Sequence, residues 1–227
     1  MTDHNNSPEI IKTGDGSHSL YLANLDETYH SRHGAMQESQ FVFIQNGLEQ
    51  VAKKIHSIKI LEVGFGTGLN ALLTWEFSTS LDLSIEYHSL ETNPLSNELM
   101  TQYAIGLGWS DERIKQFLSM HSAEWEHLVK LDNNFSLKKC KSSIQDFDPS
   151  QNSFDLIYYD AFGPRAQPEM WNKTIFMKLY DCLQSNGVFV TYCAKGQVRR
   201  DLSEVGFEME RLPGPPGKRE MLRGIKS

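Results

Sequence analysis

The stretch that decides the fold is Lys59-Ile60-Leu61-Glu62-Val63-Gly64-Phe65-Gly66-Thr67-Gly68-Leu69-Asn70. Its beginning, Ile60 to Val63, is a short apolar run that suits a buried parallel strand. Three glycines at alternate positions follow, and the residues after Gly68 read as the first turns of a helix. A glycine-rich turn between strand and helix lets the backbone approach a ligand with no Cβ in the way, so the stretch predicts a nucleotide-like ligand here.

The glycine spacing separates two classes of ligand. A dinucleotide fingerprint has the form G-x-G-x-x-G/A, but here Leu69 occupies the place of the final small residue, which argues against a dehydrogenase. Glu62 precedes the first glycine by two positions. The resulting E-x-G-x-G-x-G pattern resembles motif I of Rossmann-like methyltransferases that use S-adenosylmethionine. The resemblance implies a cofactor site made by Glu62, Gly64, Gly66 and Gly68; the alternative is a glycine-rich turn without a ligand.

Length and composition restrict the class of protein to which the chain can belong. At 227 residues the chain is long enough for one α/β domain with a small N-terminal addition. No apolar run approaches the roughly 18 residues that cross a bilayer. The N-terminus has no basic patch followed by an apolar core, so no secretory signal is expected. The three cysteines and eight histidines show no metal-type spacing. We therefore expect a cytoplasmic protein with no membrane segment and no metal.

The charge distribution is uneven. A net charge of −7 argues against broad, non-specific nucleic-acid binding, which depends on phosphate neutralisation. Residues 195–227, however, carry eight Lys/Arg against five Asp/Glu. That surplus is compatible with a local basic face or with an ordinary solvated surface.

Patterning along the chain predicts alternating strands and helices. Residues 1–18 form a polar terminus with a turn at residues 14–16, and the segments on either side of that turn could pair as a hairpin. Residues 27–35 are dense in groups that bind polar ligands. Helices are expected at residues 35–54, 94–107, 169–183 and 195–205, and strands at residues 60–63, 84–90, 137–142, 154–160, 188–192, 207–212 and 220–225. We expect an N-terminal hairpin and helix extension, residues 1–55, and a Rossmann-like domain, residues 56–227.

Two acidic residues follow predicted strands at the edge where α/β sheets bind ligands. Glu91 ends the second strand, where a nucleotide fold holds ribose hydroxyls; capping a turn is the alternative. Asp160 ends the fourth strand, where it can hold or deprotonate an acceptor N–H, or cap the following turn. Phe162 and Tyr192 lie where they could stack on a ring or pack in the core. Ser143 follows the third strand, at the position where many methyltransferases carry an adenine-binding Asp.

Four separated motifs carry a more specific resemblance. They are Leu61 to Asn70; Asp160-Ala161-Phe162-Gly163-Pro164 with Pro168-Glu169-Met170-Trp171; Val198-Arg199-Arg200 before Gly206-Phe207; and Gly217-Lys218-Arg219-Glu220-Met221-Leu222. Together with Glu38-Ser39-Gln40-Phe41-Val42-Phe43, they resemble the MnmC-type tRNA methyltransferase family over roughly residues 15–225. The resemblance implies a class I methyltransferase fold, with a seven-stranded, mostly parallel sheet that ends in an antiparallel hairpin.

The resemblance also implies a reaction: methyl transfer from S-adenosylmethionine to the amine of 5-aminomethyl-2-thiouridine at the tRNA wobble position, giving 5-methylaminomethyl-2-thiouridine. Asp160 would face the acceptor amine, and Glu91, Ser143 and Asp160 itself would join the cofactor site. The substrate side would include Phe162, Pro164 and Tyr192. Four basic residues would contact tRNA phosphates or, alternatively, belong to an ordinary surface: Arg199, Arg200, Lys218 and Arg219.

Two other functions remain open. The first is a small-molecule N- or O-methyltransferase, which would share the cofactor half and differ only on the acceptor side. The second is a non-catalytic module that binds the cofactor or a partner. Known members of the family fuse this domain to a flavin-dependent oxidoreductase that makes the amine. Nothing in this sequence resembles that half, so we expect methylation alone, with a separate enzyme supplying the aminomethyl substrate.

Overall fold

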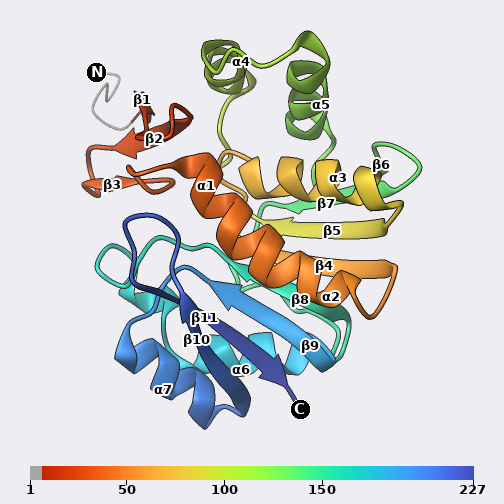
Figure 1. Cartoon of the computed structure of the whole chain (residues 1–227), viewed down its shortest axis with the longest axis vertical. Coiled ribbons are helices and arrows are strands. Elements are labelled where there is room, and N and C mark those ends of the chain that lie inside the picture. Colours follow the sequence, from red (N-terminus) through yellow and green to blue (C-terminus); the bar gives the residue numbers. More distant parts are fainter. Residues whose placement is uncertain (1–6) are drawn as a thin grey trace.

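A central sheet of eight strands organises the computed structural model, which describes residues 7–227 (Figure 1). The strand order is β10-β11-β9-β8-β4-β5-β7-β6. The strands are β4 (Ser57–Val63), β5 (Ser84–Leu90), β6 (Leu128–Lys130), β7 (Phe135–Cys140), β8 (Phe154–Tyr159), β9 (Leu183–Thr191), β10 (Phe207–Pro213) and β11 (Glu220–Lys226). The five central strands are parallel, and β11 runs antiparallel to β9 and pairs with β10 as the predicted closing hairpin. The predicted class I methyltransferase fold is confirmed.

The predicted count of seven strands was one too low. The additional strand, β6, pairs antiparallel with β7 at the edge of the sheet. It has three residues, of which only Val129 is not exposed. A strand this short and this exposed leaves no apolar alternation in the sequence, which is why the pattern did not indicate it.

Helices cover both faces of the sheet. They are α3 (Leu69–Leu81), α4 (Asn97–Gly106), α5 (Asp111–Ser122), α6 (Lys173–Cys182) and α7 (Gly196–Glu204). One apolar cluster joins the sheet to α3 and the N-terminal helix, and a second joins the opposite face to α6 and α7. The β4–α3, β5–α4 and β8–α6 connections leave the carboxyl ends of the parallel strands, where the predicted ligand residues lie.

The predicted N-terminal helix is confirmed as one continuous helical segment. It consists of α1 (Ala35–Ser39), a π-helical middle η1 (Gln40–Leu48) and α2 (Glu49–Ala52). At Gly47 an added Cβ would lie 3.1 Å from a Val190 methyl group and 3.3 Å from the Tyr158 ring, so the glycine lets this helix lie close against the sheet. Within this helix, Ile44, Leu48 and Val51 are buried, whereas Phe41 is half-buried.

The N-terminal hairpin is also confirmed. Strands β1 (Glu9–Lys12) and β2 (His18–Leu22) pair antiparallel, and β3 (Glu27–Thr28) extends them into a small sheet. This sheet is fixed to α4, because the Tyr103 hydroxyl donates to the His18 carbonyl at 2.7 Å. Residues 1–6 lie outside the described residues. They include part of the expected polar terminus and the start of the chain, from which we expected no secretory signal.

Several predicted boundaries moved, and for two helices a capping residue sets the observed start. Helix α4 begins after Ser96, whose side chain accepts from Leu99 N, rather than at residue 94. Helix α6 begins after Asn172, with a 3₁₀ turn, η2 (Pro168–Met170), preceding it. Strand β7 lies two residues earlier than predicted, and α5 was not predicted. Among the described residues, no helix is long and apolar enough to span a membrane.

Candidate active site

The glycine-rich turn has the conformation that its sequence predicts. Gly64, Gly66 and Gly68 have φ values of 98°, 51° and 73°, in the region that favours glycine. An added Cβ at Gly64 would lie 2.9 Å from the Asp160 carbonyl oxygen, so a side chain there would push the turn away from the β8 end. The amide groups of Gly64 and Phe65 both donate to the Leu90 carbonyl, at 3.0 and 3.1 Å. The turn is thereby fixed to the end of β5.

Glu91 lies at the end of β5, beside this turn. Its Oε2 accepts from Gly66 N at 2.9 Å, and its Oε1 accepts from Asn93 N at 2.8 Å. Each carboxylate oxygen can accept a further hydrogen bond, and Glu91 lines the adjoining cavity. A carboxylate held in this way has room for a pair of ribose hydroxyl groups, and that role of Glu91 stays a prediction.

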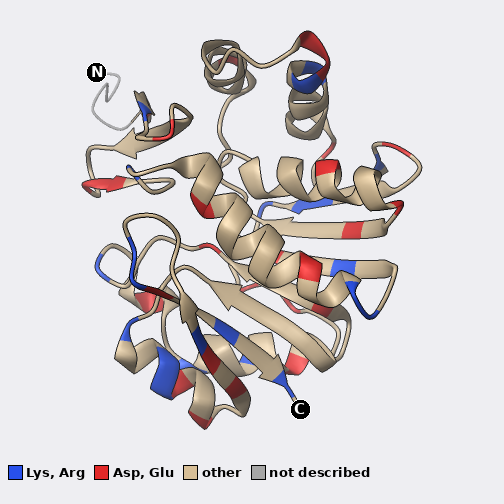
Figure 2. Ribbon diagram, viewed as in Figure 1, with Lys and Arg blue, Asp and Glu red and all other residues tan. Residues whose placement is uncertain are grey.

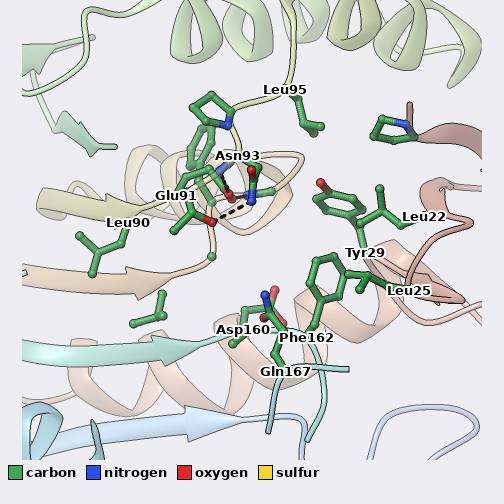
Figure 3. A pocket seen from close by; sticks show the side chains of 18 of the residues that line it. Leu22, Leu25, Tyr29, Leu90, Glu91, Asn93, Leu95, Asp160, Phe162 and Gln167 are labelled. Carbon is green, nitrogen blue, oxygen red and sulfur yellow. Dashed lines mark hydrogen bonds between the residues drawn. The ribbon is translucent and has the colours of Figure 1, made fainter. Parts of the chain in front are cut away.

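A cavity of about 1050 Å³ opens above the carboxyl ends of the central strands (Figure 3). Its size is at the upper end of the roughly 300–1,000 Å³ of ligand pockets, so a cofactor and an acceptor group could share it. Six predicted site residues line it: Gly64, Gly66, Glu91, Ser143, Asp160 and Phe162. The lining also includes residues to which the sequence assigned no individual role, among them Leu22, Leu25, Tyr29, His30, Asn93 and Gln167.

Asp160 is the carboxyl group that β8 delivers to this cavity. Its backbone N donates to the Val63 carbonyl at 3.0 Å, and its Oδ2 accepts from the Asn70 amide at 2.8 Å. The side chain is half-buried, and the burial, together with the nearby Glu38 and Glu62 carboxyl groups, raises its pKa above the ordinary range. A carboxyl group with a raised pKa that borders a cavity is suited to accepting a proton.

Glu62 does not reach the cavity. Its side chain is fully buried behind the turn, where Ser89 Oγ donates to it at 2.7 Å and Asn70 Nδ2 at 3.1 Å. Burial raises the pKa of Glu62 to about 8. Gly68 also lies outside the cavity lining, at the N-cap position that precedes α3. The predicted cofactor roles of Glu62 and Gly68 stay predictions, and any such role would be indirect.

Ser143 lines the cavity beyond the end of β7. Its hydroxyl donates to Asp146 Oδ2 at 2.7 Å, and Asp146 N donates back to Ser143 Oγ at 3.2 Å. The next residue, Ile144, is buried and also lines the cavity. The adenine-binding role of Ser143 stays a prediction, with Ile144 providing an apolar wall beside it.

Aromatic rings form the side of the cavity nearest Asp160. Phe162 and Tyr29 meet edge to face, with ring centroids 5.2 Å apart, and both line the cavity. Tyr192 and Pro164 are not part of the lining. The Tyr192 hydroxyl donates to the Ala161 carbonyl at 2.8 Å, so this ring supports the Asp160 loop from behind. Substrate contacts by Tyr192 and Pro164 stay predictions.

Residues 22–30 of the N-terminal segment cover one side of the cavity, which the sequence did not indicate, and we call them the roof. Arg165 donates to the Asp26 carbonyl at 2.8 Å and pairs with Glu27 at 2.9 Å. His30 Nε2 and Thr67 Oγ1 share a hydrogen bond of 2.7 Å, which ties the segment directly to the glycine-rich turn. The density of polar and aromatic groups in residues 27–35 was the available signal, but their position opposite Asp160 depends on the fold.

The four predicted phosphate-binding residues have different surroundings. Arg200 and Arg219 are exposed, while Arg199 is half-buried. Lys218 is half-buried too, and its ammonium pairs with the buried carboxyl of Glu38. Figure 2 shows Lys and Arg on α7 and on the turn between β10 and β11, both at the left of that view. A role of all four in phosphate binding stays a prediction.

A sequence model of an S-adenosyl-L-methionine-dependent methyltransferase family matches residues 110–227, just over half of the chain. The chain belongs to this family. It is an S-adenosylmethionine-dependent methyltransferase, and the glycine-rich turn, the Glu91 carboxylate and the cavity fit this cofactor. No group of metal-binding side chains occurs among residues 7–227.

Named relatives agree with the resemblance to MnmC-type enzymes. The chain is 31% identical to the tRNA 5-methylaminomethyl-2-thiouridine biosynthesis bifunctional protein MnmC of Nitrosospira multiformis, covering 90% of this chain and 35% of the relative. The protein of the same name from Idiomarina loihiensis is 32% identical, covering 88% and 36%. The crystal structure of MNMC2 from Aquifex aeolicus superposes with a TM-score of 0.77 at 25% identity, covering 98% of this chain and 71% of that one. The chain thus spans about a third of the length of these curated relatives.

Proposed function

We propose that this methyltransferase acts on the amine of 5-aminomethyl-2-thiouridine at the tRNA wobble position and produces 5-methylaminomethyl-2-thiouridine. The observation that carries the proposal is the Asp160 carboxyl group, which borders a cavity beside the cofactor turn and has no cation as a direct partner among the described residues. An acceptor amine can use such a group to orient its lone pair and to release a proton. The names of the relatives supply the specific amine.

The chemistry requires a neutral amine, because an ammonium has no lone pair. The bound cofactor supplies an activated methyl group on a sulfonium. Asp160 accepts a hydrogen bond from the amine and orients its lone pair, which is chiefly a positioning effect. When the nitrogen–carbon bond forms and the carbon–sulfur bond breaks, the product nitrogen carries one proton too many. The raised pKa of Asp160 makes its carboxylate a suitable acceptor for that proton.

Substrate contacts follow from the aromatic side of the cavity. A wobble base that leaves its stack needs an apolar platform, and the rings of Phe162 and Tyr29 offer one next to Asp160. We further propose that Pro164 and Tyr192 shape the loop that carries Phe162, since the Tyr192 hydroxyl is bound to the loop backbone.

The tRNA backbone would lie over α7 and the β10–β11 turn. Arg199, Arg200 and Arg219 supply cations there, and Lys218 contributes its charge from a half-buried position. With a net charge of −7 over the whole chain, we expect tRNA affinity to come from this face and to fall steeply with salt. A tRNA substrate also implies that the enzyme acts in the cytoplasm.

We propose that the aminomethyl group is made at a different active site. The sequence has no second glycine-rich nucleotide fingerprint, so an oxidoreductase activity has no counterpart in these residues. The supplying enzyme would be a separate protein or another part of a longer one. Within this chain we propose a functional division between the roof and helix, residues 1–55, and the cofactor-binding domain, residues 56–227.

The decisive test uses tRNA that bears 5-aminomethyl-2-thiouridine, incubated with labelled S-adenosylmethionine and analysed as nucleosides. We expect labelled 5-methylaminomethyl-2-thiouridine, and its loss with Asp160→Ala. Asp148→Ala, which removes an exposed carboxylate outside the cavity, is the matched control and should retain activity. Cofactor binding without label in the tRNA would refute the proposal and favour a small-molecule acceptor. Cellular function that survives Asp160→Ala would favour the non-catalytic role.

A further inference from the structure

One side-chain amide lies between two carboxyl groups at the base of the active site. Asn70 Nδ2 is 2.8 Å from Asp160 Oδ2 and 3.1 Å from Glu62 Oε1. Asn70 is only 3% exposed and does not line the cavity, so it cannot bind a ligand directly. An amide NH₂ carries two hydrogens, which allows one hydrogen bond to each carboxyl group at the same time.

The two carboxyl groups are bridged without a cation of their own. The cation that acts on Asp160 is Lys218, which comes from the β10–β11 turn and already pairs with Glu38 of the N-terminal helix. Two more carboxyl groups face the pair, Glu38 toward Asp160 and Glu91 toward Glu62. The hydroxyls of Tyr87 on β5, Tyr158 on β8 and Tyr192 after β9 face it as well. None of these groups supplies a positive charge. Two neighbouring carboxylates in such surroundings repel each other, so the pair retains a proton at a pH where isolated acids would be ionised.

Geometry decides which carboxyl group keeps that proton. Glu62 is fully buried, and its Oε2 lies 2.7 Å from Ser89 Oγ, a hydroxyl that can accept a hydrogen bond as well as donate one. Asp160 borders the cavity, where water and substrate can solvate a charge. A neutral Glu62 fits the dry position, and its pKa, raised by burial to about 8, agrees with that assignment.

We propose that Asn70 is a positioning residue for methyl transfer: with Glu62 protonated behind it, its amide holds Asp160 as the carboxylate that faces the acceptor amine. This inference rests on the proposed function for the identity of the acceptor. The Asn70 hydrogen bond stabilises the charged form of Asp160, and its loss would both raise the pKa of Asp160 and free the side chain to rotate. Cofactor affinity would not depend on it.

The experiment compares Asn70→Leu with the parent enzyme, using aminomethylated tRNA over a range of pH. We expect kcat to fall by about 10²-fold, in the range of general acid–base effects, and the acidic limb of kcat/KM to move to higher pH. The dissociation constant for S-adenosylmethionine should stay within about threefold, because a change in the orientation of Asp160 toward the acceptor leaves the cofactor contacts intact. Thr74→Val, which removes a buried hydroxyl one turn further along α3, is the control and should leave the pH profile unchanged. If Asn70→Leu does not fold, Asn70→Asp replaces it in this test, because an aspartate cannot donate a hydrogen bond to both acids.

Glu62→Gln tests the charge assignment, because the amide of glutamine mimics a protonated carboxyl group that donates to Ser89. The acidic limb should stay where it is in the parent. Difference infrared spectroscopy at neutral pH should show a protonated-acid C=O band in the parent that is absent in the variant. If the acidic limb of kcat/KM in Glu62→Gln moves to lower pH, or if the parent lacks the protonated-acid band, Glu62 is not the protonated group and the assignment is overturned. An unchanged kcat and pH profile in Asn70→Leu would overturn the positioning role.

Failure of the proposed function would look different. If the parent enzyme does not label aminomethylated tRNA, the acceptor is wrong, and the infrared measurement still decides whether Glu62 is protonated. If the parent enzyme is active and the infrared band is missing, the function stands and the inference fails.

Discussion

The ammonium of Lys218 lies 3.9 Å from the centre of the Tyr192 ring while it pairs with the buried carboxyl of Glu38. The Tyr192 hydroxyl, in turn, donates to the Ala161 carbonyl in the loop behind Asp160. One cation therefore joins the N-terminal helix, the end of β9 and the β10–β11 turn. Its neighbour Arg219 is exposed. Two adjacent basic residues thus have different physical roles, although the sequence predicts the same role for both.

Lys218→Ala should lower stability, because it leaves Glu38 buried without its cation. Breaking a buried pair costs about 3–5 kcal/mol, and the partial exposure of Lys218 reduces our expectation to about 2 kcal/mol. Urea denaturation followed by circular dichroism measures the change. Arg219→Ala is the matched control, which should keep its stability and lose tRNA affinity. Equal stability of the two variants would show that Lys218 acts only at the surface.

Glu91→Ala should weaken cofactor binding. The carboxylate has both oxygens fixed by backbone amides, of Gly66 and Asn93, and still has capacity for two ligand hydroxyls. Hydrogen bonds to a charged group contribute about 1.5–3 kcal/mol, so the dissociation constant of S-adenosylmethionine should rise by at least about tenfold. Isothermal titration calorimetry gives the value directly. Glu112→Ala, an exposed change on α5, should bind the cofactor like the parent. Parent-like affinity in Glu91→Ala would leave Glu91 as a turn cap only.

The positions of the candidate cofactor residues were predictable because the signals for them are local. Gly64, Gly66 and Gly68 follow a strand and precede a helix, and Glu91 and Asp160 each follow a predicted strand. Side chains that follow parallel strands meet at one edge of the sheet, so three short segments suffice to place them.

The roof was not predictable for the opposite reason. Tyr29 lies far from the glycine-rich turn in sequence, and its segment has no periodic apolar spacing that would fix its path. In the structure its ring would lie 3.0 Å from a Cβ added at Gly66, a contact created by the tertiary fold alone. Lys139 shows the same limit: it belongs to a strand, yet its buried ammonium donates to the His121 carbonyl at 2.7 Å. No pattern of charge or period indicates such a contact.

The aromatic side of the cavity gives a third prediction. Phe162→Ala and Tyr29→Ala should each lower kcat/KM for tRNA by at least about fivefold, since stacking on a base contributes about 1–3 kcal/mol. Tyr29→Phe keeps the ring and should retain most of the activity. Steady-state kinetics with aminomethylated tRNA at saturating cofactor provides the comparison. Turnover by Phe162→Ala equal to that of the parent would eliminate the stacking proposal for that ring.

Two buried histidines give a prediction about pH. His30 and His121 both bind Thr67, the first at its hydroxyl and the second through Nε2–H to its carbonyl at 3.1 Å. Burial lowers the pKa of each histidine to about 4 from 6.5. Between pH 6.5 and 4 the unfolded chain therefore binds protons that the folded chain does not, and each histidine lowers stability as the pH falls.

From pH 7 to pH 5, this linkage amounts to about 2 kcal/mol for each histidine. Glu62 acts in the opposite direction, because its raised pKa makes the folded chain bind a proton that the unfolded chain binds only at lower pH. The measurement must therefore compare His30→Asn with the parent at each pH. We expect the stability difference between variant and parent to shift by about 2 kcal/mol in favour of the variant at pH 5 relative to pH 7. An equal stability difference at pH 5 and pH 7 would mean that His30 takes up its proton in the folded state. The His30–Thr67 contact would then have to accommodate a positive charge.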